Sequence, residues 1–305
     1  MYRIGIDIGG PKISIGLFNC DGNLLIENKK EYIKSIKDLR GHIMNTVSEL
    51  AGNNGISINE IEFCGIGIPG TVSADGKRIL KAPNIGILSE NLASEAELDL
   101  GIPVALIQDS RAAAWGEYLL CEDKPKVLVC ITLGTGIGTG IVINGEIFHG
   151  GFGSAGEIGH LPVKDGGRPC GCGKRGCLEK YSAGGGLDIS AAELLGEGKT
   201  SADLFSEAKG GNEEAIAIIS EAVRSLGVGL VSVINLLSPD CILFSGGLSL
   251  QKELYVDPLI EYVKKHCYSA GRLPTMRPAQ LGESAPLYGA ALMPIGNRRA
   301  QRNCR

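Results

Sequence analysis

The sequence predicts an α/β fold made of two similar halves, and three observations lead to this prediction. Near the start, an apolar strand at residues 3–8 is followed by a glycine-rich turn, a second strand, a tight turn and a third strand. The same order recurs about 125 residues later, beginning with a strand at residues 127–133. The chain of 305 residues is also long for one hydrophobic core. A duplication of this kind predicts two halves with the same topology.

The first half alternates strands with helices. Apolar residues recur at helical spacing from Ile36 to Leu50, and short apolar runs bounded by glycine or proline indicate strands. We therefore expect strands at 3–8, 13–17 and 24–26, a helix over 36–51, a strand at 61–68, a helix over 89–100, a strand at 103–107 and a helix over 111–120.

The second half repeats the opening pattern and then becomes mainly helical. Its tight turn is Asn144-Gly145, a dipeptide typical of hairpins. The expected elements are strands at 127–133, 139–143 and 146–148, helices over 201–209 and 213–237, a strand at 241–244, and helices over 251–266 and 286–293. We predict an N-terminal lobe of residues 1–112 plus 286–305, and a C-terminal lobe of residues 113–285.

Composition excludes several classes of protein. Hydrophobic residues make up 44% of the chain and charged residues 21%, as in ordinary globular proteins. A net charge of −4 argues against nucleic acid as a partner. The chain enters a strand at once and has no run of 18 apolar residues, so we expect neither a signal peptide nor a membrane span. Scattered cysteines in apolar runs predict a reducing compartment, and hence the cytoplasm.

Three cysteines and one histidine lie close together in the segment 157–179. They are His160, Cys170, Cys172 and Cys177. One Zn²⁺ ion binds four nitrogen or sulfur ligands in a tetrahedron, and this set fills such a site completely, so the ion would be structural. The alternative is three free thiols and a surface histidine. The Cys-x-Cys-x4-Cys spacing with surrounding glycines favours a zinc-binding loop.

Polar side chains stand at both ends of this loop. Glu157 and His160 precede the cysteines, and Glu179 follows them. Two carboxylates and an imidazole on a segment held by a metal ion are suited to binding several hydroxyl groups. The sequence therefore predicts a polyol receptor here.

Glycine-rich turns follow three of the predicted strands. Their residues are Gly9 and Gly10, Gly134 to Gly136 with Thr135, and Gly246 and Gly247. Without a Cβ, backbone N–H groups can approach phosphate oxygens, so the three turns together predict a polyphosphate or nucleotide site. Asp7 could hold Mg²⁺ and Lys12 could neutralise phosphate. As alternatives, the turns are ordinary turns, Asp7 caps one of them and Lys12 is solvated.

Asp109 ends another predicted strand, between Gln108 and Ser110. A carboxylate at the carboxyl end of a strand lies where α/β domains bind ligands, and it could take a proton from an attacking hydroxyl. It could equally cap the helix that follows. Both interpretations remain open from the residues alone.

The motifs together resemble the ROK family of repressors, open reading frames and kinases. The resemblance rests on Asp7-Ile-Gly-Gly, on Gly134-Thr-Gly-Ile-Gly, on Glu157-Ile-Gly-His160 and on the Cys170 to Glu179 segment, and it covers residues 3–293. It implies a two-lobed actin, Hsp70 and hexokinase-like fold of RNase-H-like topology. It also implies transfer of the ATP γ-phosphate to a hexose, usually at O6.

The resemblance also assigns roles to individual residues. It implies Asp109 as the general base and His160, Cys170, Cys172 and Cys177 as zinc ligands. It implies a substrate site made of Gly70, Asn84, Gln108, Asp109, Glu157, His160 and Glu179. ATP and Mg²⁺ would bind at the glycine turns, and the family commonly forms homodimers. The family's regulators carry an N-terminal DNA-binding domain, and we expect none here because the first predicted strand begins at residue 3.

Three positions depart from the family pattern. The first phosphate turn usually is Gly-Gly-Thr-Lys, but position 11 is Pro, which lacks a hydroxyl and a backbone N–H. The usual Asn-Asp-Ala-Asn is Gln108-Asp109-Ser110-Arg111. The glucose-type segment Pro-Asn-Leu-x-Gly-Trp lacks its tryptophan near Asn84. The first departure bears on catalytic rate, and the other two bear on the identity of the sugar.

We therefore expect an ATP-dependent kinase that phosphorylates a hexose at its 6-hydroxyl, similar to glucokinases, with Zn²⁺ as a structural ion. One alternative is a kinase for N-acetylmannosamine, N-acetylglucosamine, fructose, mannose or allose, suggested by residues 108–111. The alternative from another class is a catalytically weak sugar-binding regulator, suggested by Pro11.

Overall fold

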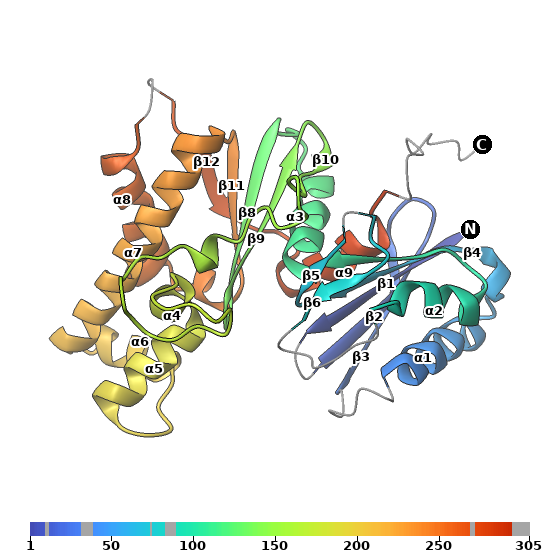
Figure 1. The fold of residues 1–305 in the computed structure, drawn as a ribbon, viewed down its shortest axis with the longest axis horizontal. Coiled ribbons are helices and arrows are strands. Elements are labelled where there is room, and N and C mark those ends of the chain that lie inside the picture. The colour runs from blue at the N-terminus through green and yellow to red at the C-terminus, as the bar shows by residue number, and fades with distance from the viewer. Residues whose placement is uncertain (10–11, 32–38, 74, 83–89, 269–271, 295–305) are drawn as a thin grey trace. The chain divides into compact units, whose positions relative to one another are not determined.

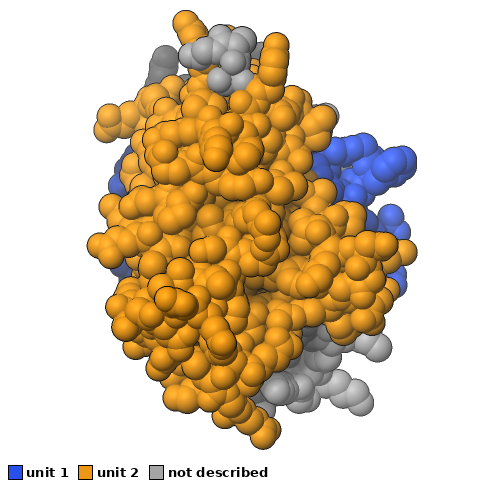
Figure 2. Space-filling model, turned by 90° about the vertical axis from the view of Figure 1, so that its left-hand side faces the viewer, with its two compact units in different colours: residues 1–121, 147–155, 284–305 blue, residues 122–146, 156–283 orange. Residues whose placement is uncertain are grey.

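The computed structural model describes residues 1–9, 12–31, 39–73, 75–82, 90–268 and 272–294 (Figure 1). The chain divides into two compact units, coloured separately in Figure 2. Unit 1 comprises Met1–Cys121, Ile147–Ala155 and Ser284–Arg305, and unit 2 comprises Glu122–Glu146 and Gly156–Glu283.

Unit 1 is built on a five-stranded sheet of order β3-β2-β1-β4-β7 (Figure 1). Its strands are β1 (Tyr2–Gly9), β2 (Lys12–Phe18), β3 (Leu24–Glu31), β4 (Ile61–Ile68) and β7 (Val104–Gln108). The first three form antiparallel pairs, whereas β1, β4 and β7 run parallel. The parallel strands therefore deliver the residues that follow them to one edge of the sheet. A two-stranded ribbon of β5 (Thr71–Val72) and β6 (Ile79–Lys81) follows β4.

One face of this sheet is an aliphatic core. Alternate residues of β1, namely Ile4, Ile6 and Ile8, are fully buried and belong to one cluster with residues of α1 (Leu39–Asn53) and α2 (Leu92–Leu100). The period of two in the strand thus places all three isoleucines against the same pair of helices.

The opposite face of the sheet carries glycines where helix α9 (Ala285–Ala291) packs. Gly5 of β1 pairs with Gly16 of β2 and with Gly65 of β4, so the three form one row. A Cβ at Gly65 would overlap the carbonyl oxygen of Ala290. The backbone of α9 therefore lies almost directly on the sheet.

Glycines also bring α9 close to α3 (Asp109–Leu120). A Cβ on Gly289 would overlap the carbonyl group of Ala112, and one on Gly116 would lie 3.0 Å from the nitrogen of Gly289. The indole nitrogen of Trp115 donates a hydrogen bond of 2.9 Å to the carbonyl oxygen of Leu292. The sheet thus fixes α9, and α9 fixes α3.

Unit 2 repeats the sheet topology of unit 1. Its order is β10-β9-β8-β11-β12, with β8 antiparallel to β9 and parallel to β11, and β11 parallel to β12. The strands are β8 (Val127–Leu133), β9 (Ile137–Ile143), β10 (Glu146–Ile147), β11 (Cys241–Ser245) and β12 (Thr275–Pro278). The predicted duplication is confirmed by this correspondence.

Helices α4 to α8 complete unit 2. They are α4 (Glu179–Ser182), α5 (Gly184–Leu195), α6 (Ser201–Lys209), α7 (Glu213–Leu237) and α8 (Asp257–His266). The side chain of Asn212 caps α7 by accepting from two backbone N–H groups of its first turn. Among the described residues, α7 alone is long and apolar enough to cross a bilayer, and its apolar side includes Ile219, Leu226 and Leu230 in the core of unit 2.

Most predicted elements are confirmed, and the misses have local causes. Strand β9 begins at Ile137, two residues before the prediction, because the turn 134–136 is shorter than its run of glycines suggested. The predicted helix over 251–266 opens with a π-helical turn at Lys252–Val256. Helix α5 and strand β12 were missed, because α5 begins with three glycines and β12 ends in proline. The start of the predicted helix over 36–51 lies outside the described residues.

The two units differ from the predicted lobes of 1–112 plus 286–305 and 113–285. The whole of α3 belongs to unit 1, as does the segment Ile147–Ala155. The physical reason for the first difference is the close packing of α3 on α9, which the sequence pattern did not reveal.

The glycine row leads to a stability prediction. Gly65→Ala should cost at least about 3 kcal/mol of unfolding free energy, because the new methyl group meets a helix backbone that cannot move away. Gly52→Ala is the control, since Gly52 lies in α1 of the same unit with open space around it, and alanine there should stabilise by roughly 0.5–1 kcal/mol. Urea denaturation of both variants measures the difference. Equal effects would contradict the packing argument.

Candidate functional site

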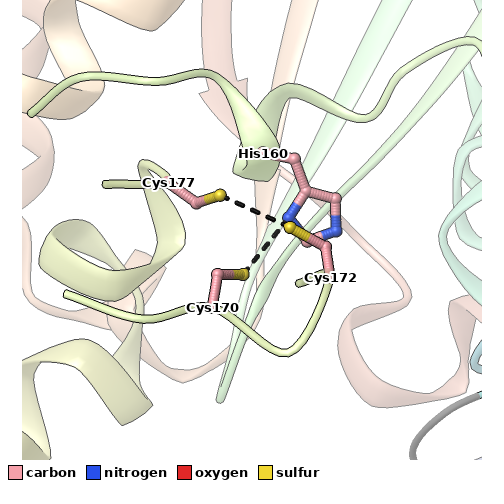
Figure 3. Close-up of side chains that lie close together, drawn as sticks. All are labelled: His160, Cys170, Cys172 and Cys177. Carbon is pink, nitrogen blue, oxygen red and sulfur yellow. Dashed lines mark hydrogen bonds between the residues drawn. The ribbon is translucent and has the colours of Figure 1, made fainter. Parts of the chain in front are cut away.

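The four predicted metal ligands converge in unit 2 (Figure 3). The ligand atoms of His160, Cys170, Cys172 and Cys177 all lie within 4.8 Å of one another. The sulfur of Cys170 is 3.6 Å from Nδ1 of His160, and the sulfurs of Cys172 and Cys177 are 3.6 Å apart. Zn–S bonds of about 2.3 Å in a tetrahedron place two sulfurs about 3.8 Å apart, so the donor set fits Zn²⁺.

Local turns bring the cysteines together. The N–H of Cys170 donates to the carbonyl of Lys174, and the N–H of Gly173 donates back to the carbonyl of Cys170. Gly173 and Gly176 have φ angles of 88° and 77°, which favour glycine. The segment therefore needs its glycines in order to turn the three thiols toward one point.

The predicted hydroxyl-binding residues lie beside this cluster. Nδ1 of His160 faces the cysteines, whereas its Nε2 lies 3.9 Å from a carboxylate oxygen of Glu157. The thiol of Cys170 donates to Oε1 of Glu179 at 3.3 Å. Nδ1 of His160 is thus positioned for a metal ion, whereas Nε2 points toward the carboxylate of Glu157. Glu157, His160 and Glu179 are therefore linked to one another through the contacts of His160 and Cys170.

The glycine turn after β8 adjoins this group. A Cβ at Gly136 would lie 2.9 Å from Oε2 of Glu179, so glycine is needed to make room for the carboxylate. The N–H groups of Gly184 and Gly185 donate to the carbonyls of Gly134 and Thr135 at 2.8 and 3.0 Å. The turn 134–136 is therefore held from both sides.

Sequence reasoning missed the contribution of the start of α5 to this turn. The only signal is the run Gly184-Gly185-Gly186, and a Cβ at Gly184 would lie 2.9 Å from the carbonyl oxygen of Gly134. The pair Gly246 and Gly247 follows β11, and Gly246, with φ of 84°, would bring a Cβ within 2.5 Å of the carbonyl oxygen of Leu133. Both segments thus meet the end of β8.

In unit 1 the carboxyl edge of the sheet brings two acids near each other. Asp7 lies two residues before the end of β1, and Asp109 follows β7, with β4 between these strands. Gly67 of β4 pairs with Asp7 and has no side chain, so a Cβ there would lie 3.5 Å from Oδ1 of Asp7. Burial raises the pKa of Asp7 to about 7, and the negative charges of Asp109 and Glu27 add to the effect against Lys29.

Asp109 occupies the first turn of α3 and is not the residue that precedes it. Gln108 takes the N-cap position without a capping hydrogen bond from its side chain, and Oδ1 of Asp109 accepts from the N–H of Ser110 at 2.6 Å. A carboxylate at a helix N-terminus is stabilised by the positive end of the helix dipole. This placement is compatible with a base at the edge of the sheet.

The remaining predicted residues divide into two groups. Gly9 and Lys12 are exposed at the β1–β2 turn, and Gly70 follows β4, where a Cβ would lie 3.0 Å from Cα of Ala82. Gly10, Pro11 and Asn84 lie outside the described residues.

The cluster leads to a metal-dependence prediction. Cys172→Ser should lower bound zinc to well below one ion per chain. It should also lower the free energy of unfolding by at least about 2 kcal/mol, because the loop loses the metal ion that would cross-link it. Cys20→Ser, at an exposed position outside the cluster, is the control. Elemental analysis and thermal melts measure both effects. Native zinc content and melting in the Cys172 variant would contradict the four-ligand site.

The raised pKa of Asp7 gives a second prediction. The folded protein retains the Asp7 proton up to about pH 7, whereas the unfolded chain loses it near its ordinary value of 3.8, so this group reduces stability as pH rises across that window. Asp7→Asn should therefore match the native protein at about pH 4 and exceed it at pH 8 by on the order of 2–4 kcal/mol. Urea denaturation at both pH values tests this, with Asp21→Asn, at an exposed turn, as control for a lost charge. The same difference in unfolding free energy between variant and native protein at both pH values would contradict the raised pKa of Asp7.

Comparisons with known proteins agree with this geometry. A glucokinase of Streptomyces coelicolor is 34% identical, over 94% of this chain and 96% of its own length. An N-acetyl-D-glucosamine kinase of Aliivibrio salmonicida is 29% identical, over 95% of this chain and 99% of its own. The crystal structure of a ROK family glucokinase from Streptomyces griseus, in complex with glucose and AMPPNP, superimposes with a TM-score of 0.78 at 32% identity, covering 95% of this chain and 98% of that one.

The superposition confirms the predicted fold class, a mixed α/β fold shared with ROK hexokinases. The model of the ROK family matches residues 3–296, which is nearly the whole chain. The repeated sheets, the Cys3His cluster and this match lead to one conclusion: the chain belongs to the ROK family.

Proposed function

We propose that the protein is an ATP-dependent sugar kinase that phosphorylates a hexose at its 6-hydroxyl, with glucose as the first candidate. The observation that carries the proposal is the gathering of Glu157, His160 and Glu179 beside the Cys3His cluster. Full-length similarity to a glucokinase supports it, as does the relative that was crystallised with glucose and an ATP analogue.

The polar groups of unit 2 suit a hexose. Carboxylates accept hydrogen bonds from hydroxyl groups, and the Nε2–H of His160 donates one when Nδ1 holds a metal ion. A Zn²⁺ ion on Nδ1 would fix the orientation of the ring, which is the role of a structural ion. Glu157 and Glu179 then bind neighbouring hydroxyls from the two ends of one rigid loop. Gly70, Asn84 and Gln108 complete the proposed substrate site.

Asp109 is the proposed general base. It would accept the proton of the 6-hydroxyl as that oxygen attacks the γ-phosphorus, and the bond from phosphorus to the β–γ bridging oxygen breaks. Its position at the start of α3 keeps the carboxylate at the sheet edge, in the first turn of a helix that is fixed by α9. Dry surroundings would favour transfer to the sugar over transfer to water.

The glycine turns are the proposed ATP site. Backbone N–H groups at 134–136 and near Gly9 and Gly10 would hold phosphate oxygens, and Gly246 and Gly247 would pass beside the nucleoside. Asp7 would hold Mg²⁺, which prefers oxygen ligands, and Lys12 would neutralise phosphate charge. The predicted homodimer and cytoplasmic location are kept as part of this proposal.

A kinase for N-acetylglucosamine is the second candidate. Relatives with that activity in their names are 29% identical over 95% of this chain. The residues around the base also differ from the usual family pattern at Gln108, Ser110 and Arg111. These residues flank the proposed base, so they bear on which sugar is accepted.

An ADP-release assay over a panel of hexoses and N-acetylhexosamines tests the proposal. The expected result is turnover with one or a few hexoses, and a product oxidised by glucose-6-phosphate dehydrogenase when glucose is the substrate. Turnover with N-acetylglucosamine alone would establish the second candidate. Hexose binding without turnover would instead fit a sugar-binding regulator and overturn the kinase.

Asp109→Asn should lower kcat by about 10²- to 10⁴-fold, since the amide cannot accept the hydroxyl proton. Hexose binding, measured by calorimetry, should stay within about threefold, because the amide retains a hydrogen-bonding oxygen of the same size. Asp21→Asn, at an exposed turn of the same unit, should keep native kinetics. Near-native turnover by a folded Asp109 variant would remove Asp109 from the role of base.

A further inference from the structure

A fully buried arginine lies two residues after the proposed base. Arg111 has no exposed surface and stands in the first turn of α3, where Asp109 also stands. The family pattern noted above usually has asparagine at this position. Burying a guanidinium is costly unless its N–H groups are hydrogen-bonded, so the partners of Arg111 indicate what the substitution does.

The guanidinium binds the backbone of a segment far away in the sequence. Its Nη2 donates to the carbonyl oxygens of Gly153 and Ala155 at 2.8 and 3.0 Å. Charged donors make stronger hydrogen bonds than neutral ones, and two carbonyls on one nitrogen fix both position and direction. Asparagine is too short to reach the same two carbonyls from this backbone position. The contact therefore depends on the long side chain.

The segment that Arg111 holds is itself tightly turned. The N–H of Ala155 donates to the carbonyl of His149 at 3.1 Å, and Gly153 has φ of 73°. Burial lowers the pKa of His149, and the positive charge of Arg111 lowers it further, so the imidazole is neutral near pH 7 and does not repel the guanidinium. One backbone hydrogen bond thus joins the two ends of the segment 149–155.

The chain then runs directly into the proposed hexose site. Gly156, with φ of 90°, lies against β9, where a Cβ would come within 2.6 Å of the carbonyl oxygen of Thr139. The N–H of Ile158 donates to the carbonyl of Gly156, and that of His160 donates to the carbonyl of Glu157. Gly159 also lies against β9, since a Cβ there would come within 2.6 Å of the carbonyl oxygen of Ile137.

We propose that Arg111 is a positioning residue for hexose binding: by holding the carbonyls of Gly153 and Ala155 it sets the course of the chain into Glu157 and His160. The inference rests on the proposed hexose-kinase function for its kinetic consequence. The arginine that replaces the usual asparagine at position 111 would thus hold the segment that precedes Glu157. Arg111 and Asp109 share the first turn of α3, and the residues that Arg111 holds belong to the same unit.

Arg111→Met tests the inference, since methionine fills much of the space but donates no hydrogen bond. The KM for the hexose should rise about tenfold or more, while the KM for ATP stays within about twofold. Hydrogen–deuterium exchange at the amides of 150–160 should speed up, whereas exchange in 170–178 and the zinc content should not change. Arg40→Met, which removes an exposed ion pair with Asp99 in the same unit, is the control and should change neither KM.

Two further variants keep the test decisive if Arg111→Met does not fold. Arg111→Lys keeps the charge but not the fork of the guanidinium, and should give a smaller rise in the hexose KM. Gly153→Ala leaves Arg111 intact but strains the held segment at φ of 73°, and should reproduce the rise. Native hexose KM and native exchange in a folded Arg111 variant would overturn the proposal. If the native enzyme phosphorylates no hexose, the kinase proposal fails, and the exchange measurement still decides whether Arg111 holds 150–160.

Discussion

The fold of unit 1 depends on the direct packing of helix α9 against the sheet. Gly5, Gly16 and Gly65 leave three adjacent strands without side chains where α9 packs, and Gly116 and Gly289 do the same between α9 and α3. Two backbones in contact allow no sliding, because each carbonyl fits a space that a methyl group would fill. The end of α3 at the sheet edge is therefore fixed, and with it the carboxylate of Asp109 near Asp7.

Unit 2 reaches a comparable precision by a different route. The loop that carries the Cys3His cluster is rich in glycine, so its shape comes from turns and from four side chains that converge on one point. Glu179 closes the loop and lies against Gly136, so the proposed hexose-binding and phosphate-binding groups share one contact. A loop held by a metal ion can present charged groups that a hydrophobic core would exclude.

Arg111 lies on a helix fixed by α9 and contacts the segment that precedes the Cys3His loop in the chain. In unit 1 it is part of the helix that α9 fixes, and its guanidinium binds the segment that leads to Glu157. A buried charge that loses its partners is strongly destabilising, so the guanidinium favours the arrangement in which both carbonyls stay in place. We regard the substitution at 111 as a local solution to the same problem of holding a glycine-rich segment in place.

The sequence by itself determined the repeated α/β topology, the four residues of the Cys3His cluster and the polar residues at the ends of the loop. These features are local, because they depend on strand period, on turn residues and on ligand spacing along the chain. Only the tertiary structure decided that α3 belongs with α9, that Gly67 opens the space beside Asp7, that α5 supports the turn 134–136 and that Arg111 binds 153–155. Each of those contacts joins residues far apart in sequence, where the pattern of one segment carries no information about the backbone that another segment brings against it.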